Sequence, residues 1–284
     1  MPARQSQRNA SRRRSKSARN GQGQGHSDGA RSSGWLYGFH PVREALRARR
    51  RTLGRLWLRA GAPREDHAEL ADLARQAGVL VEVVDREDID ALAGGDAQTQ
   101  GVALEAGPIP ELTIEALVAR AHETGGSRVL LALDGVEDPQ NVGAVARVAE
   151  SAGAAGLILT DRRAPELTPA VARASAGAIE WLPVARVPNL VRALGGLQRE
   201  GYWVVAASAE EGQALFEMED RLLSGPVVLV LGAEGKGIRP GVLKAADHRV
   251  WIPMLGEVAS LNVSTAGAVL LYDLLRRNQR VNPA

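Results

Sequence analysis

The chain has 284 residues, of which 45% are hydrophobic and none is cysteine, and its formal net charge is +2. This length and apolar content suffice for two folded domains, and the lack of cysteine excludes disulfides, thiolate metal sites and cysteine nucleophiles. No apolar run approaches the roughly 20 residues that a membrane-spanning helix needs, and the N-terminus lacks the apolar segment of a secretory signal. We therefore expect a soluble, cytoplasmic protein without a membrane partner.

Positive charge is concentrated at the N-terminal end of the chain. Residues 1–59 carry fifteen lysine and arginine side chains against two acidic ones, a net +13, whereas the remainder sums to −11. Such a block either binds a polyanion or keeps a solvated segment soluble. Because seven of the arginines lie within 43–59, where the chain is expected to fold, we favour a nucleic-acid partner.

The first part of the chain divides into a tail, a small domain and a linker. Residues 1–33 contain no Leu, Ile, Val or aromatic residue, which predicts a disordered basic tail. Residues 34–106 are predicted to form a small α/β domain, with strands at 55–59, 79–84 and 101–106 and a helix at 65–77. The stretch 107–114 contains Gly and Pro and is typical of a linker.

Residues 115–284 alternate short apolar strands with helices. Strands are predicted at 129–135, 156–160, 181–185, 202–208, 226–232 and 249–254, and helices near 142–152, 169–176, 188–199 and 262–279. Strands that are apolar throughout and separated by helices indicate an α/β fold with a parallel sheet covered on both faces. Ligands bind such sheets at the carboxyl ends of the strands, so the loops that follow strands are candidate sites.

The first candidate loop spans residues 133–154. Asn141 occupies the position expected of a helix N-cap, and Arg147 follows six residues later in a helix otherwise rich in Gly and Ala. Small side chains allow a close approach, so we expect this helix to pack tightly against a neighbour. For this loop taken alone, the simpler interpretation is that Asn141 only caps the helix and that Arg147 is a solvated side chain.

The second candidate loop, "VLVLGAEGKGIRPGVL", places Gly232, Gly235 and Gly237 after a buried strand. A P-loop would need Ser or Thr where Gly237 stands, and the glycine spacing differs from that of the dinucleotide fingerprint. A tight turn would explain the glycines by themselves. Glu234 between them is nevertheless an unusual choice for a turn without another role.

The third candidate loop, "IPMLGEVASLNVSTAGAVLL", leads into an apolar helix. Four small polar residues crowd the start of this helix: Ser260, Asn262, Ser264 and Thr265. One capping residue would satisfy the free N–H groups of the first turn, so four exceed what the helix needs. A helix N-terminus also presents several N–H groups to one point, which favours a ligand there.

Together the three loops are more specific than each alone. In order and spacing, "DPQNVGAVARVAESAG", "LVLGAEGKGI" and "IPMLGEVASLNVSTAGAVLLYDLLR" resemble the three motifs of the SpoU (TrmH-like) family of RNA ribose 2′-O-methyltransferases, in the SPOUT class. The resemblance extends over about residues 34–280. "YGFHPVREAL" followed by a small α/β domain is similar to the RlmB-type subgroup, whose members methylate a guanosine ribose in bacterial 23S ribosomal RNA and whose N-terminal domain resembles RNA-binding ribosomal proteins.

The resemblance implies a C-terminal trefoil knot, a homodimer that pairs through the knot region, and S-adenosylmethionine as the cofactor. The implied cofactor contacts are Gly232, Ile252 and Leu261. The implied catalytic residues are Asn141, Arg147, Glu234, Ser260 and Asn262. No metal is implied, and the histidines are scattered without the spacing of metal ligands.

Two questions stay open from the sequence. Family proposals make Arg147 the base, but a guanidinium with a pKa above about 12 is a poor base and a good phosphate clamp, and Glu234 is the other candidate proton acceptor. The alternatives for function are a relative that acts on transfer RNA or another ribosomal site, and a non-catalytic RNA-binding protein of ribosome assembly.

Overall fold

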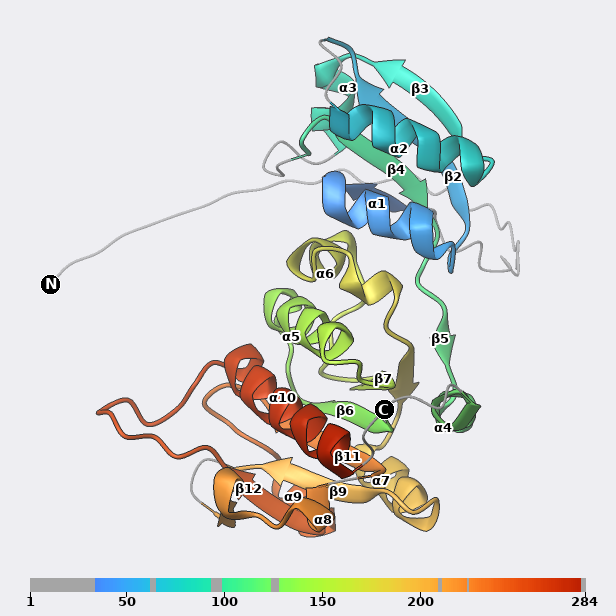
Figure 1. Ribbon diagram of the computed structural model, residues 1–284. Helices are drawn as coiled ribbons and strands as arrows, with labels where there is room; N and C mark the ends of the chain where they lie inside the picture. The colour runs from blue at the N-terminus through green and yellow to red at the C-terminus, as the bar shows by residue number, and fades with distance from the viewer. Residues whose placement is uncertain are drawn as a thin grey trace, which may run out of the picture. The chain divides into compact units, whose positions relative to one another are not determined.

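The computed structural model describes residues 34–61, 65–92, 99–123, 128–208, 211–223 and 225–281. These residues form a four-stranded sheet and an eight-stranded sheet, and helices pack against both (Figure 1). The tail predicted at 1–33 lies outside the described residues. Within the described part of the chain, no helix has the length and apolar character that crossing a membrane requires.

The four-stranded sheet has the order β1-β4-β2-β3, and its helices are α1, α2 and α3. Its elements are β1 (Gly34–Tyr37), α1 (Phe39–Ala48), β2 (Leu53–Arg59), α2 (Glu65–Gln76), β3 (Leu80–Val84), α3 (Arg86–Leu92) and β4 (Val102–Ala106). β2 and β3 pair in parallel, whereas the β1–β4 and β2–β4 pairs are antiparallel. Leu56 and Leu58 of β2 are buried and the residues between and beside them are less so, which is the period of two expected of a strand. The predicted strands and the predicted helix of this segment are confirmed.

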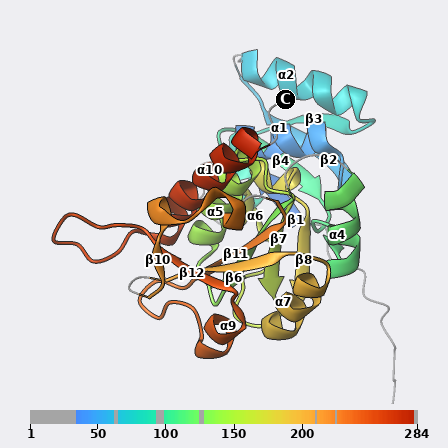
Figure 2. The same ribbon diagram turned by 60° about the horizontal axis from the view of Figure 1, so that its bottom comes forward.

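The eight-stranded sheet has the order β10-β12-β9-β11-β6-β7-β8-β5, and all its pairs are parallel. Its strands are β5 (Glu111–Leu112), β6 (Val129–Asp134), β7 (Gly156–Thr160), β8 (Val184–Val187), β9 (Trp203–Ala207), β10 (Gln213–Ala214), β11 (Val227–Gly232) and β12 (His248–Trp251). The helices are α4 (Ile114–Glu123), α5 (Pro139–Ser151), α6 (Pro169–Ala174), η1 (Ala178–Glu180), α7 (Leu190–Arg199), η2 (Leu215–Glu217), α8 (Asp220–Leu223), α9 (Pro240–Ala245) and α10 (Val263–Val281). Figure 2 shows helices on either side of these strands.

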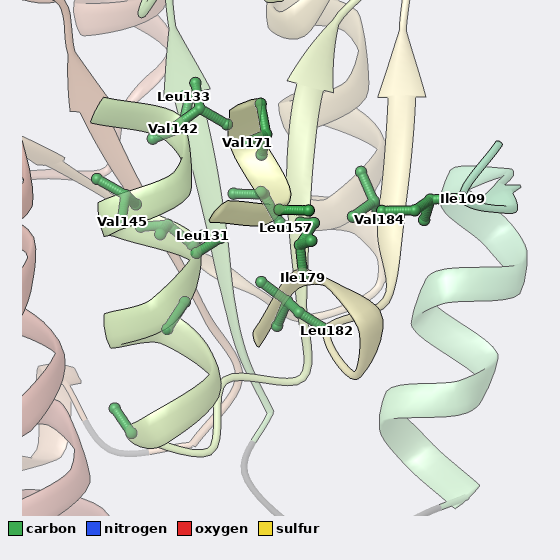
Figure 3. Packing of buried hydrophobic residues seen from close by; sticks show 14 of the residues in the cluster. Ile109, Leu131, Leu133, Val142, Val145, Leu157, Val171, Ile179, Leu182 and Val184 are labelled. Atoms are coloured by element: carbon green, nitrogen blue, oxygen red, sulfur yellow. The ribbon is translucent and has the colours of Figure 1, made fainter. Parts of the chain in front are cut away.

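Successive residues of the central strands enter two different cores. Leu131 and Leu133 of β6 belong to the cluster that includes Val142 and Val145 of α5, which Figure 3 shows from close by. The residue between them, Ala132, belongs to the second cluster together with residues of α7 and α9. Every residue of β6 and β7 is buried. The predicted parallel sheet with both faces covered is therefore confirmed.

The structure differs from the sequence-based expectation at two strands. β8 begins at Val184 rather than at residue 181, because Ala178–Glu180 form a 3₁₀ turn and Pro183 has no N–H to donate to a ladder. The stretch expected to be a linker, 107–114, contains β5, which pairs in parallel with Val184 and Ala185. A strand of two residues has no detectable hydrophobic period, so the sequence could not reveal it.

The Gly- and Ala-rich helix α5 packs closely against α6, as the sequence predicted. A Cβ atom added at Gly143 would lie 2.8 Å from the carbonyl oxygen of Val171, a distance that real side chains do not tolerate. α10 packs along α5 as well. Because only glycine allows this approach, α5 is held firmly between its neighbours and presents its first turn at a fixed place.

Several arginines of the run 43–59 make structural contacts. Arg51, whose side chain is 7% exposed, donates to the carboxylate of Glu180 and to the carbonyl oxygen of Gly107. Arg50 donates to the carbonyl oxygens of Glu180 and Leu182 at 3.1 and 2.9 Å. From the sequence alone, the whole run favours a nucleic-acid partner. These two guanidinium groups are instead occupied by protein acceptors, because Glu180 is buried and needs a cationic partner.

Candidate active site

The carboxyl ends of β6 and β11 lie side by side, since Asp134 and Gly232 are paired in the parallel ladder. Two of the three candidate loops therefore leave the sheet from neighbouring positions. The third leads from β12 into α10, whose Gly267 lies against Leu231 of β11. Parallel pairing thus gathers segments that are about a hundred residues apart in the sequence.

A cavity of about 870 Å³ lies at this edge of the sheet, within the size range of small-molecule sites. Six of the predicted site residues line it: Gly232, Glu234, Ile252, Ser260, Leu261 and Asn262. Asn141 and Arg147 are not among its lining residues. The predicted cofactor contacts and part of the predicted catalytic set are thus found around one cavity, and their individual roles stay predictions.

Asn141 is joined to the cavity by a hydrogen-bond network. Nδ2 of Asn141 donates to Oε1 of Glu234 at 3.3 Å. Oδ1 of Asn141 accepts from Nδ2 of Asn262 at 3.1 Å. Asn262 also donates to the same Oε1 of Glu234. Among the described residues Glu234 Oε2 accepts no hydrogen bond. One carboxylate oxygen is therefore held by two amides while the other is left for a ligand.

The N-cap of α5 is Asp138, which corrects the position inferred for Asn141. The Asp138 side chain accepts a hydrogen bond from the Gln140 N–H at 2.9 Å, and Pro139 occupies the first helical turn. Proline at this position and aspartate before it are both favoured, which explains the earlier start of the helix. The simple capping role for Asn141 is thereby excluded, and its side chain is used in the network instead.

The start of α10 shows how its small polar residues are used. Oδ1 of Asn262 accepts from the N–H of Ser264 at 2.8 Å and from its hydroxyl at 2.6 Å, which caps the helix. The amide nitrogen of the same side chain binds Asn141 and Glu234. Ser260 lines the cavity and does not cap the helix. One asparagine therefore caps the helix and belongs to the site, and the remaining polar residues exceed what the cap requires.

Arg147 stands apart from this network. It is exposed, and its side chain makes no hydrogen bond or ion pair within the described part of the chain. Six residues of α-helix separate it from Asn141, a distance of about 9 Å along the axis. The structure thus does not show Asn141 or Glu234 orienting the guanidinium, which is free to bind an anion.

Sequence reasoning missed an ion pair beside the cavity, between a buried carboxylate and a half-exposed guanidinium. Asp134, at the end of β6, accepts from the backbone N–H of Arg239 at 2.8 Å and from its Nε at 2.7 Å. The acidic residue that ends the apolar run 129–133 was the available signal. Its partner lies 105 residues away, however, so the pairing itself had no local signature.

The loop after β9 also contributes lining residues that the sequence did not single out. Ala207, Ser208 and Glu211 line the cavity, and Glu211 forms an ion pair with Arg249. The end of the predicted strand 202–208 was the signal, because it is another carboxyl end of the same parallel sheet. Among the described residues, no group of three His, Cys, Asp or Glu side chains could hold a metal ion.

Two family profiles match the chain. Residues 128–272 match the SpoU rRNA Methylase family, which covers about half of the chain and includes all three candidate loops. Residues 35–112 match the family described as RNA 2′-O ribose methyltransferase substrate binding. The second match covers the four-stranded sheet and β5.

Individual relatives give the same result. The chain is 38% identical over 245 residues to the 23S rRNA (guanosine-2′-O-)-methyltransferase RlmB of Pseudomonas aeruginosa, covering 85% of this chain and 96% of that protein. It is 36% identical to an uncharacterized tRNA/rRNA methyltransferase of Synechocystis, covering 85% of this chain and 62% of that protein. In fold it is similar to the SpoU methyltransferase AviRb of Streptomyces viridochromogenes in complex with AdoMet, with a TM-score of 0.69, 22% identity, and coverage of 87% and 90% of the two chains.

Proposed function

Because the chain belongs to the SpoU rRNA methylase family, we propose that it transfers a methyl group from S-adenosylmethionine to the 2′-hydroxyl of one guanosine in bacterial 23S ribosomal RNA. One observation carries the proposal. Three loops that are distant in the sequence meet in the network of Asn141, Glu234 and Asn262 at a cavity large enough for a cofactor. A scaffold without catalytic activity would not require this network.

The cavity has the chemical character that S-adenosylmethionine requires. Apolar side chains such as Leu231, Val250 and Leu270 suit an adenine ring, and the carboxylates of Glu211 and Glu234 suit the positively charged part of the molecule. Gly232, Ile252 and Leu261 would hold the cofactor, chiefly through backbone groups. When bound, S-adenosylmethionine supplies an electrophilic methyl group.

In this proposal Glu234 receives the proton of the ribose hydroxyl. Its Oε1 is fixed by the two asparagine amides, so Oε2 is the atom that faces no protein donor and can accept the proton. The proton moves to Oε2 as the ribose oxygen takes the methyl group, and Ser260 lies close enough to the cavity to orient the hydroxyl. Removing a poorly acidic proton requires an acceptor held at a fixed distance, which the asparagines provide.

Arg147 would act on the RNA backbone rather than as the base. Its guanidinium is exposed and unpaired among the described residues, and a bidentate fork is well suited to a phosphate next to the reacting ribose. Its positive charge would also stabilise the oxygen as negative charge develops there. Helix α5, whose Gly and Ala side chains let it pack closely against its neighbours, supports this role because it holds the arginine on a rigid element.

The roles that we propose for the parts of the chain follow the domains inferred from sequence. Residues 34–106 would bind the RNA substrate, 107–114 would connect, and 115–284 would form the knotted methyltransferase domain; the basic residues 1–33 would add affinity for RNA. The family profile at 35–112 supports the first assignment. The protein would work in the cytoplasm, where ribosomal RNA is made in bacteria.

We also propose a homodimer formed through the C-terminal knot region. Leu255 and Val258, in the segment before α10, are exposed apolar residues, as is Tyr272 on α10. Leu255 and Val258 lie three residues apart, and neighbouring exposed apolar side chains support a protein interface. Sedimentation equilibrium of the purified protein checks this, and a monomer at micromolar concentration would contradict it.

The function is tested by mapping 2′-O-methylation in 23S ribosomal RNA and transfer RNA from cells with and without the gene. We expect one 23S guanosine to lose its methyl group, and wild-type protein but not Glu234→Gln to restore it. Glu137→Gln is the matched control, because Glu137 is an exposed glutamate outside the network. Loss of a transfer RNA site would favour the alternative substrate, to which the Synechocystis relative's name points. No lost site would favour a non-catalytic RNA-binding role.

A further inference from the structure

We infer that Asp134 and Arg239 form a positioning pair that fixes Glu234 and the glycine-rich wall of the cavity for methyl transfer. This inference rests on the proposed function, because it assigns a role to residues that act through Glu234. Neither Asp134 nor Arg239 lines the cavity, so neither is placed to touch the cofactor. Their effect on the reaction must pass through the loop that they hold.

The pair combines a fully buried carboxylate with a half-exposed guanidinium. The Asp134 side chain has no exposed surface, whereas 43% of the Arg239 side chain is exposed. Oδ1 of Asp134 accepts from Nε at 2.7 Å and lies 2.6 Å from Nη2, and Oδ2 accepts from the Arg239 backbone N–H at 2.8 Å. A buried charge is tolerated only when it is paired and hydrogen-bonded, and here both carboxylate oxygens are satisfied by one residue.

Asp134 anchors both ends of the loop that carries Glu234. Its carbonyl oxygen accepts from the N–H of Ala233 at 3.2 Å, and its carboxylate holds Arg239 at the other end. Between these anchors the loop forms a turn, since the N–H of Gly237 donates to the carbonyl oxygen of Ala233 at 2.8 Å. Glu234 is the residue directly after the first anchor, so a shift of Ala233 or Arg239 would move its carboxylate.

The network at Glu234 is sensitive to such a shift. Asn141 reaches Glu234 from α5 and Asn262 reaches it from the start of α10, so the carboxylate must meet two elements that the loop does not contain. Hydrogen bonds weaken steeply with distance and angle, and a misplacement of about 1 Å can lower a reaction rate by about 10²-fold. An ion pair that fixes the loop from inside the sheet provides the required precision.

The chain offers a matched control for the charge pair. Arg276 on α10 also has a side chain that is 43% exposed, and it forms an ion pair at 2.7 Å with a nearly buried aspartate, Asp273. Neither residue lines the cavity. Arg276→Gln therefore removes the same kind of interaction from a place where it cannot move Glu234.

The test compares kcat, the KM for RNA and the affinity for S-adenosylmethionine in Asp134→Asn, Arg239→Gln and Arg276→Gln. Rates are measured well below each variant's unfolding temperature, so that only folded protein is compared. We expect at least a tenfold loss of kcat in the first two variants, a KM for RNA within about twofold of wild type, and wild-type values for Arg276→Gln. Wild-type kcat in folded Arg239→Gln and Asp134→Asn would overturn the inference.

A double-mutant cycle with Glu234→Gln separates positioning from a general structural effect. If the pair acts through Glu234, Asp134→Asn should lower kcat by less than twofold in the Glu234→Gln background. A purely structural role would give the same loss in both backgrounds and would overturn the inference. Should Asp134→Asn fail to fold, the same cycle with Arg239→Gln decides, because that change keeps the backbone hydrogen bond to Asp134.

The combination Asp134→Asn with Arg239→Gln addresses direct RNA binding by Arg239. If the two residues act as one ion pair, the double variant should lose no more activity than the more damaged single variant. A multiplied loss with a raised KM for RNA would mean that Arg239 holds RNA itself, which overturns the pair. Absence of methylation by the wild-type protein would instead refute the proposed function, and the pair would then be judged by the affinity for S-adenosylmethionine.

Discussion

Replacing Gly232 with alanine tests the cavity wall most directly. A Cβ atom at this position would lie 2.6 Å from the carbonyl oxygen of Gly237, whereas ordinary contacts begin at 3.4 Å. The loop would have to retreat by at least 0.8 Å, the difference between these distances. Because Gly232 is paired with Asp134 inside the sheet, its strand is held in place, and the loop that contains Gly237 must move instead.

The size of the effect follows from this displacement. Overpacking of a well-packed site costs about 1–3 kcal/mol. If the loop must return to its native place to hold S-adenosylmethionine, this energy is subtracted from the binding free energy. Because about 1.4 kcal/mol corresponds to a tenfold change in the dissociation constant, the affinity weakens about 5- to 140-fold. The protein should stay folded, since the strain is relieved when the loop moves outwards.

Isothermal titration calorimetry with S-adenosylmethionine measures the predicted loss, and thermal unfolding checks the fold. Gly241→Ala is the control, because a Cβ there would meet only Val191, at an ordinary 3.8 Å. This variant should bind like wild type. Wild-type affinity in folded Gly232→Ala would refute the assignment of this wall to the cofactor.

Three further changes test other parts of the molecule. The Arg147→Lys and Arg147→Ala variants should both bind S-adenosylmethionine but methylate RNA poorly, and the residual activity of Arg147→Lys should follow the wild-type pH profile. A near-normal rate of Arg147→Lys with a pH profile displaced to lower pH would make Arg147 the base. Deleting residues 1–33 removes +7 of charge and should flatten the salt dependence of RNA binding, so an unchanged slope would exclude contact between the tail and RNA. Burial raises the pKa of Glu44, but the hydrogen bond from Trp181 and the guanidinium groups beside it outweigh burial and leave the pKa below its ordinary value of 4.5. The resulting stability is present above that ordinary value and is lost as the pH falls through the lowered pKa, so Glu44→Gln should cost about 1.5–3 kcal/mol at neutral pH in chemical denaturation, and the difference from wild type should shrink in acid.

Features that repeat along the chain could be predicted from the sequence. The unbroken apolar runs that became β6, β7 and β11 indicated buried parallel strands, and the loop after β11 proved to line the cavity. Gly143 and its small neighbours indicated close helix packing, which the contact with α6 confirms. These signals are local, because the hydrophobic period and residue size are properties of neighbouring positions.

The pairing of distant residues was decided only by the tertiary structure. Asp138 rather than Asn141 caps α5, which leaves Asn141 to meet Glu234 and Asn262, and nothing in the sequence between them indicates that meeting. The strand order placed Asp134 beside Gly232 and within reach of Arg239. Local patterns determine which segments become strands and helices, whereas the order of strands in the sheet depends on long-range packing, and that order brings the chemically important side chains together.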